Sequence, residues 1–296
     1  MPRFCGSGRD RCCRSIGPFG LWGGSGKVAV PATASPVTAG SSVASSAAVG
    51  VVAIGHSGLT GENSDPARPA HSDAPENSWA TGTSPQVNSV YTRLAAIRPE
   101  TKGHVANTAQ GGAKAESLAA QARAALLKVP TPALVIIQTI DNDIRCDGTD
   151  ASHVGEFGTQ VADALNVITT ASPRSQILIV GQLGRPSPTF IEKLVVKVPA
   201  VKADLTTGDA CAFYDSTGAL VTSNFATLTT IIDSYEAEQT RQCSAVPNCA
   251  TDGGTRARYV DTVENFSPDW AHLNAKGNAA AAALIWPRVT ALLKLT

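Results

Sequence analysis

A serine flanked by glycines follows a continuous apolar run near the start of the chain. Residues 47–54 read AAVGVVAI, and Ser57 comes three positions later, between Gly55 and Gly58. Such a run is typical of a strand buried on both faces. A serine at the carboxyl end of that strand can expose its hydroxyl and offer its amide to a developing oxyanion. Taken alone, the segment fits a glycine-rich turn better. The α/β-hydrolase nucleophile motif G-x-S-x-G is excluded, because Leu59 stands where its second glycine is needed.

An aspartate and a histidine three residues apart lie near the other end of the chain, in SPDWAHLN. With this spacing the carboxylate of Asp269 can hold one ring nitrogen of His272 while the other nitrogen faces a nucleophile. A helix-capping aspartate beside a surface histidine is the alternative. The combination of this pair with Ser57 is more specific than either part, and predicts a Ser-His-Asp arrangement.

Two further loops can supply hydrogen-bond donors for an oxyanion. Residues 107–113, NTAQGGA, place glycine amides before a predicted helix, where negative charge is favoured. Asn142 follows another apolar run, and its side-chain amide can also donate. Each loop alone fits ordinary turn chemistry as well.

Strands and helices alternate along the residues that must position these loops. Apolar runs predict strands at residues 47–54, 104–106, 133–137, 176–180 and 257–260. Helical periodicity is found at residues 114–128, 154–170, 190–198, 226–239 and 275–293. This alternation predicts right-handed βαβ units and a parallel sheet covered on both faces. Functional loops then gather beyond the carboxyl ends of the strands, which is where the candidate residues lie.

The four loops, in this order, resemble the conserved blocks of SGNH (GDSL-type) hydrolases. Ser57 matches the serine of the first block, Gly112 the glycine of the N-x-A-x-x-G block, and Asn142 the asparagine before an aspartate. Asp269 and His272 match the D-x-x-H block, and the resemblance spans residues 51–287.

This resemblance implies a flavodoxin-like three-layer α/β/α fold and ester hydrolysis through an acyl-enzyme. Ser57, His272 and Asp269 take the catalytic roles, and Ser57, Gly112 and Asn142 form the oxyanion hole. The sequence departs from the family pattern at His56, in place of the usual aspartate, and at Ile140, in place of a glycine. We expect His56 to crowd or perturb the serine, and Ile140 to narrow the acyl site or shift the Asn142 loop.

The chain of 296 residues carries 24 basic and 24 acidic side chains, but they are unevenly distributed. Residues 1–45 contain five basic and one acidic residue, and their Gly/Ser/Pro-rich composition predicts a disordered tail or a remnant signal or linker. The hydrolase domain is predicted to span residues 46–296. The neutral balance argues against a general nucleic-acid binder. No uncharged apolar run reaches 18 residues, which argues against a transmembrane segment.

Seven cysteines divide between these parts, three in the tail and four in the body. Cys243 and Cys249 enclose a short, turn-rich loop that one disulfide can close, which leaves Cys146 to pair with Cys211. Four reduced thiols are the alternative. Disulfides persist outside the cytosol, so a secreted or cell-envelope protein is favoured.

Other features limit what the sequence says about substrate. We expect a monomer. We also expect no cofactor, because no metal-ligand spacing is present. His71, His104 and His153 have no partner pattern, so we expect them to be solvent-facing or structural. Trp270 and the irregular stretch 62–87 are expected to line the substrate site. The substrate class is a small-molecule, lipid or carbohydrate ester. A catalytically degenerate binding protein and an acyltransferase to an alcohol are the alternatives.

Overall fold

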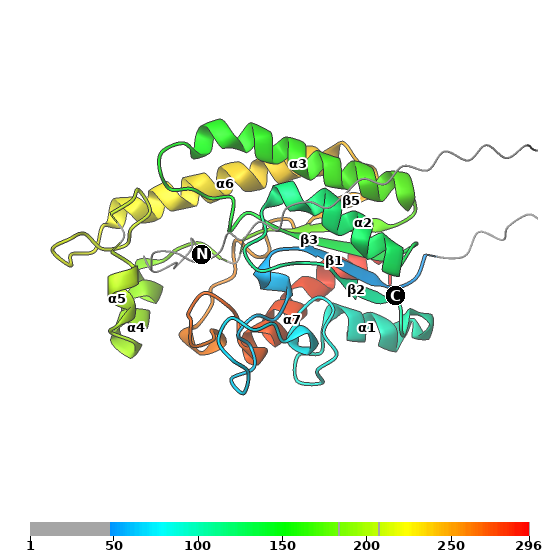
Figure 1. Ribbon diagram of the computed structural model, residues 1–296, viewed down its shortest axis with the longest axis horizontal. Helices are drawn as coiled ribbons and strands as arrows, with labels where there is room; N and C mark the ends of the chain where they lie inside the picture. The colour runs from blue at the N-terminus through cyan, green and yellow to red at the C-terminus, as the bar shows by residue number, and fades with distance from the viewer. Residues whose placement is uncertain (1–47, 183, 207, 296) are drawn as a thin grey trace, which may run out of the picture. The chain divides into compact units, whose positions relative to one another are not determined.

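A parallel β-sheet forms the centre of the computed structural model, which describes residues 48–182, 184–206 and 208–295 (Figure 1). Its strands, in the order β2-β1-β3-β4-β5, all pair in parallel. The strands are β1 (Val51–Gly55), β2 (Val105–Asn107), β3 (Leu134–Gln138), β4 (Gln176–Val180) and β5 (Cys249–Thr251). This order reverses direction beside β1, which is the point in a doubly wound sheet where ligands bind.

Helices cover both faces of the sheet, and alternate residues of the strands point to each layer. Val52, Ile54 and Val135 pack under α2, α3 and α6, whereas Val51 and Ala53 pack against α1 and α7 on the other face. Figure 1 shows these two helical layers on opposite sides of the strands. The helices are α1 (Val90–Ile97), α2 (Leu118–Lys128), α3 (Asp150–Ala171), α4 (Pro188–Lys197), α5 (Val201–Asp204), α6 (Thr222–Ser244) and α7 (Ala275–Leu293). The predicted three-layer α/β/α fold is therefore confirmed.

A third apolar cluster lies beyond the carboxyl edge of the sheet. It joins α4 and α5 to the first half of α6 and includes Phe213, Phe225 and Leu228. The rings of Phe213 and Phe225 stack with their centroids 4.6 Å apart. The short helices α4 and α5 thus have their own core at one end of the molecule.

The strand predicted at residues 257–260 is wrong. The chain turns there, and the side chain of Val260 is 81% exposed. The fifth strand is instead β5, which pairs with β4 from Ile177 opposite Cys249 onward. It escaped the sequence pattern because an edge strand of three half-buried residues has no apolar run.

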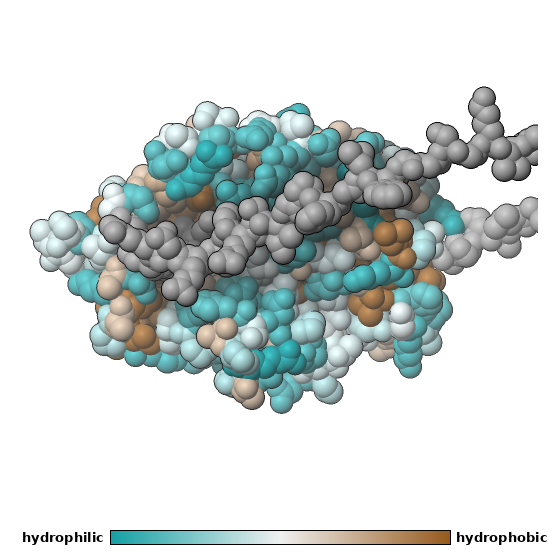
Figure 2. Space-filling view, in the orientation of Figure 1, coloured by the Kyte–Doolittle hydropathy of each residue, from teal (hydrophilic) through white to brown (hydrophobic). Residues whose placement is uncertain are grey.

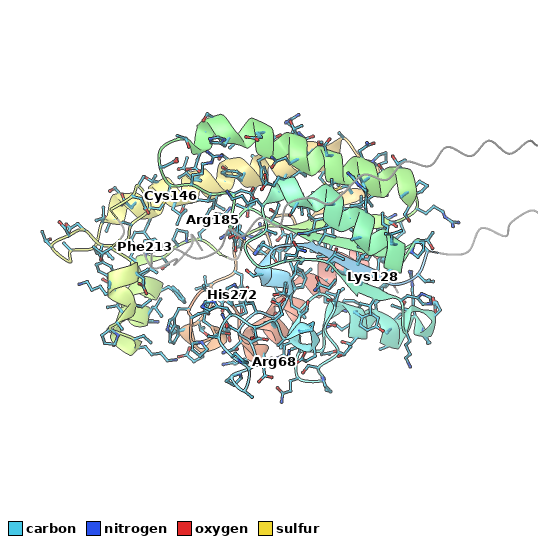
Figure 3. The ribbon with its side chains drawn as sticks, in the orientation of Figure 1. Arg68, Lys128, Cys146, Arg185, Phe213 and His272 are labelled. Atoms are coloured by element: carbon cyan, nitrogen blue, oxygen red, sulfur yellow. A yellow bond between two sulfur atoms is a disulfide. The ribbon has the colours of Figure 1, made fainter. Side chains whose placement is uncertain are left out.

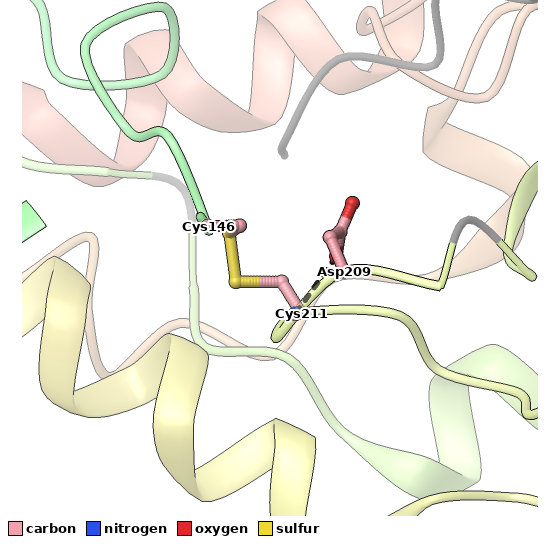
Figure 4. A group of neighbouring side chains, drawn as sticks. All are labelled: Cys146, Asp209 and Cys211. Atoms are coloured by element: carbon pink, nitrogen blue, oxygen red, sulfur yellow. Dashed lines mark hydrogen bonds between the residues drawn. A yellow bond between two sulfur atoms is a disulfide. The ribbon is translucent and has the colours of Figure 1, made fainter. Parts of the chain in front are cut away.

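Two disulfides tie together segments of this frame, in the pairing expected from the sequence. Cys243 and Cys249 close the turn between α6 and β5. Cys146 and Cys211 connect the segment after β3 to the segment between α5 and α6 (Figure 4). Residues 1–45, the predicted tail, lie outside the described residues, so the domain boundary at residue 46 remains a prediction.

Candidate active site

The candidate nucleophile Ser57 sits on a tight turn directly after β1. A 3₁₀ turn spans Ser57–Leu59, and the backbone N–H of His56 donates to the Gln138 carbonyl at the end of β3, over 3.2 Å. The imidazole Nδ1 of His56 accepts a hydrogen bond from the Gly58 N–H at 3.0 Å. A side chain at Gly58 would collide with this ring, since a Cβ there would lie 2.7 Å from His56 Cε1. His56 therefore caps the turn, in the place where the family pattern has an aspartate.

His56 is uncharged in this setting. Its side chain is buried, and burial lowers its pKa below the ordinary value of 6.5. Because Nδ1 accepts a hydrogen bond, the ring proton is on Nε2, which lies 3.6 Å from the Asp141 carboxylate. The substitution places a neutral capping ring before the serine, where the family pattern would place a second negative charge.

Ser57, His272 and Asp269 form a hydrogen-bonded line. The hydroxyl oxygen of Ser57 lies 2.8 Å from His272 Nε2, and His272 Nδ1 lies 2.5 Å from Asp269 Oδ2. A carboxylate only accepts, so Nδ1 carries the proton and Nε2 is free to accept from the serine. This is the geometry in which a histidine can act as a general base toward a serine.

A tight loop before α7 sets the spacing of Asp269 and His272. Asp269 Oδ1 accepts hydrogen bonds from the backbone N–H groups of Ala271 and His272, at 3.2 and 3.1 Å. Trp270, between them, has a left-handed φ of 57°. Asn274 caps the first turn of α7 by accepting the Gly277 N–H at 2.9 Å. The carboxylate thus fixes the backbone that carries the histidine.

The surrounding charges favour a protonated His272. Burial lowers the pKa of His272, but the hydrogen bond with Asp269 and the negative charges of Asp269 and Glu62 outweigh it and raise that pKa above 6.5. Glu62 Oε2 lies 3.6 Å from His272 Nε2. Burial raises the pKa of Asp269, but the hydrogen bonds from His272 and Asn63 lower it by more. The pKa of Asp269 therefore lies below its ordinary value.

Asn63 is a site residue that the sequence reasoning missed. Its side-chain amide donates to Asp269 Oδ2 at 2.5 Å, and its Oδ1 accepts the backbone N–H of His71 at 2.6 Å. Its backbone is left-handed, with a φ of 56°. An asparagine shortly after a glycine is the available signal, since asparagine tolerates this conformation, but the sequence pattern predicts only that the stretch 62–87 lines the substrate site.

The two predicted oxyanion loops lie on either side of the Ser57 turn and contact each other. The Gln110 N–H donates to the Gly55 carbonyl at 3.1 Å, which holds the glycine loop against the end of β1. Gly112 is exposed with a φ of 71°. The side-chain amide of Asn142 donates to the Ala113 carbonyl, the neighbour of Gly112, at 3.0 Å. One of the two Asn142 N–H groups is thereby occupied by this contact.

Ile140 holds a backbone conformation that glycine adopts readily. Its φ is 107° and its side chain is fully buried. A β-branched residue at positive φ is a strained outlier. Two hydrogen bonds of Asp143 hold the turn that follows. Its carboxylate accepts a hydrogen bond from Thr139 Oγ1 at 2.9 Å, and its backbone N–H donates to the Ile140 carbonyl at 2.7 Å. Whether Ile140 narrows the acyl site or shifts the Asn142 loop stays a prediction.

The cysteine-rich group in this region is a covalent crosslink. Cys146, Asp209 and Cys211 are the one group of three close metal-type donors among the described residues. Figure 4 shows the disulfide between the sulfurs and the hydrogen bond from the Cys211 N–H to Asp209 Oδ1, 2.8 Å long. Disulfide sulfurs are not thiolates, so this group does not offer the ligand set of a metal site. Among the residues that the structure describes, no helix is long and apolar enough to cross a membrane.

The fold and site can be compared with known proteins. Among solved structures, an extracellular lipase from Streptomyces rimosus is 16% identical, with 82% of this chain and 99% of that chain covered and a TM-score of 0.49. A phospholipase A1 from Streptomyces albidoflavus is 12% identical with the same coverage and a TM-score of 0.48. A psychrotrophic esterase from Pseudoalteromonas sp. is 10% identical, with 82% and 98% covered and a TM-score of 0.46. No curated protein sequence matches the chain.

The family model for GDSL-like lipases and acylhydrolases matches residues 51–285, from the first residue of β1 into α7. The matched range contains all of the loops described above, including Ser57 and His272. The chain therefore belongs to the GDSL-like lipase/acylhydrolase (SGNH) family.

Proposed function

We propose that this protein hydrolyses carboxylic esters through an acyl-enzyme on Ser57. The observation that carries the proposal is the hydrogen-bonded line from Ser57 Oγ through His272 to Asp269. Family membership supports the same reaction class. Ser57 is the nucleophile, His272 the general base and acid, and Asp269 the group that orients the ring.

In the first half of the reaction His272 Nε2 accepts the Ser57 hydroxyl proton as Oγ attacks the ester carbonyl. The imidazolium that forms is stabilised by Asp269 at 2.5 Å. His272 then protonates the departing alcohol oxygen as the carbon–oxygen bond breaks. In the second half the neutral ring takes a proton from water, the resulting hydroxide attacks the acyl carbonyl, and the proton returns to Ser57.

The negative charge on the carbonyl oxygen needs donors during both halves. We assign these to the backbone amides of Ser57 and Gly112 and to the Asn142 N–H that is not bound to Ala113. Loss of one such donor costs about 3–4 kcal/mol of barrier. The proposal therefore expects Asn142→Ala to lower kcat by a factor of hundreds.

The decisive experiment combines turnover with covalent labelling. The purified protein should hydrolyse a short-chain nitrophenyl ester and become labelled by a fluorophosphonate at Ser57. Ser57→Ala should abolish both, whereas Ser152→Ala, an exposed serine in α3, should change neither. Wild-type turnover in Ser57→Ala would refute the mechanism. A folded protein that neither turns over nor takes the label would favour the binding-protein alternative, and acyl transfer to an added alcohol would favour the transferase.

We also propose that the protein is secreted or held at the cell envelope, because two disulfides cross-link its domain. Mass measurement after alkylation without reductant tests this point: four alkylated body cysteines would contradict it. The expected monomer remains a prediction.

A further inference from the structure

An apolar cavity lies beside the candidate catalytic loop. Its volume is about 190 Å³, and it is lined by residues of α4, α6 and the segments 257–261 and 182–187. Its apolar walls are Phe190, Ile191, Phe213, Leu228, Ile232 and Phe266. We call this space the α4–α6 cavity.

Two contacts connect the cavity to His272. The wall residue Phe266 forms a backbone bridge with Leu273, the neighbour of His272, and the Ser267 N–H donates to the His272 carbonyl at 2.8 Å. Trp270, within the same loop, packs against the apolar cluster that contains Phe213. Figure 3 shows Phe213 on the α4–α5 side of the molecule and His272 nearer its centre.

A buried arginine connects the cavity to the serine side of the site. The guanidinium of Arg256 interacts electrostatically with Asp261, which lines the cavity, and with Asp141. Asp141 in turn lies 3.6 Å from the ring of His56, the residue before Ser57. Arg256 is therefore electrostatically coupled both to the cavity wall and to the carboxylate beside His56.

The polar groups of the cavity do not form an anion site. Two arginines lie at its wall: the Arg185 guanidinium is already paired with Asp233 and Glu236 at 2.6 and 2.5 Å, and Arg258 donates to the Gly253 carbonyl at 3.0 Å. Gln182 is buried, and its side-chain oxygen has no hydrogen-bond partner among the described residues. Hydrophobic residues are visible over α4 and α5 at this end of the molecule (Figure 2), and Val196 of α4 is 82% exposed. The chemistry that fits is an uncharged, mainly aliphatic group.

We propose that the α4–α6 cavity binds the acyl chain of the ester substrate, so that medium-chain aliphatic esters are preferred over acetyl esters. This proposal rests on the proposed hydrolysis at Ser57. The cavity volume of about 190 Å³ is several times the roughly 30 Å³ that a water molecule occupies in the liquid, so the cavity holds a chain of several carbon atoms, whereas an acetyl group would leave it unfilled.

The first test is a chain-length series of nitrophenyl esters on the full-length protein. We expect kcat/KM to rise about fourfold per methylene group from the acetyl toward the octanoyl ester, as the chain extends into the cavity. Leu228→Trp, which places a larger side chain in the cavity, should lower the octanoyl-to-acetyl ratio of kcat/KM at least tenfold. Leu127→Trp, on an 85% exposed residue of α2, is the matched control and should leave that ratio unchanged. A flat series, or a ratio unaffected by Leu228→Trp, would overturn the proposal.

A second test does not depend on turnover or on one variant folding. The ketone 2-nonanone mimics an octanoyl group and cannot be hydrolysed, so its binding can be followed by calorimetry. It should bind at least tenfold more tightly than acetone, and Phe266→Ala, which removes a wall, should weaken it. If 2-nonanone binds but no ester is hydrolysed, the cavity is a binding site for aliphatic chains and the proposed hydrolysis at Ser57 is wrong. Hydrolysis that depends on chain length in alkyl acetates, and not in acyl esters, would assign the cavity to the alcohol part and overturn the proposal.

Discussion

Replacing Asn63 by glycine tests whether a fourth residue positions the candidate triad. Asn63 donates to Asp269 Oδ2, the same oxygen that His272 Nδ1 contacts. Glycine is the appropriate replacement because the φ of Asn63 is 56°, a conformation that glycine adopts freely. The substitution therefore removes the amide without straining the turn.

The expected effect follows from the number of donors that remain. Asp269 accepts four hydrogen bonds, from Asn63, the His272 ring and two backbone N–H groups. A hydrogen bond to a charged group contributes about 1.5–3 kcal/mol. The side chain of Asp269 is 21% exposed, so water can replace part of the lost bond. We expect the lower value, about 1.5 kcal/mol, which corresponds to about a tenfold fall in kcat/KM.

The assay is nitrophenyl ester hydrolysis with kcat and KM measured separately, alongside thermal unfolding. A positioning role lowers kcat and leaves KM nearly constant. Asn88→Gly is the matched control, because Asn88 also has a left-handed φ, of 48°, and its side chain accepts a bond from nearby Thr92 and makes none to the candidate site. Asn63→Asp should be worse than Asn63→Gly, since it sets a second carboxylate against Asp269. Equal losses in Asn63→Gly and Asn88→Gly, or wild-type kcat in the former, would refute the reasoning.

Two further predictions concern proton transfer and backbone strain. The base must be neutral, and the pKa of His272 is raised above 6.5, so kcat/KM should fall as the pH drops through that raised pKa. Glu62→Gln removes one cause of the rise and should move this acidic limb to lower pH in a pH–rate profile; movement to higher pH would contradict the assignment. Ile140→Gly relieves positive-φ strain but removes a fully buried side chain. Since the loss of a large core side chain costs about 2–5 kcal/mol and strain only about 1–3, denaturant unfolding should show net destabilisation, and an increase in stability would show that strain dominates.

Local pattern was sufficient for the parts of the fold with strong periodicity. The buried runs of β3 and β4 and the helix α7 were predicted to within one residue, because each is apolar over a full element; β1 was also predicted, but it begins four residues later than its apolar run. The edge strand β5 and the short helix α1 were not predicted. Their stability comes from pairing with β4 and packing against α7, which a single stretch of sequence does not reveal.

The candidate site was predictable to the extent that its residues stand in recognisable motifs. The structure brings Ser57, His272 and Asp269 together as those motifs suggested. Asn63 and Glu62 belong to an irregular segment without periodicity, and their contacts with the last loop arise only from the tertiary fold. The capping role of His56 was also hidden, because it depends on the turn geometry and not on residue type.

The separation of the site residues along the chain has a consequence for biosynthesis. Ser57 and His272 are 215 positions apart, and His272 lies within the last tenth of the sequence. During synthesis β1 and the serine turn leave the ribosome long before the loop that carries His272, so the serine has no base until that loop has been made. Closing so long a loop is also slow relative to forming local helices. Because the proposed activity needs Ser57 and His272 in contact, its appearance during refolding should report the docking of the Asp269–His272 loop onto the serine turn.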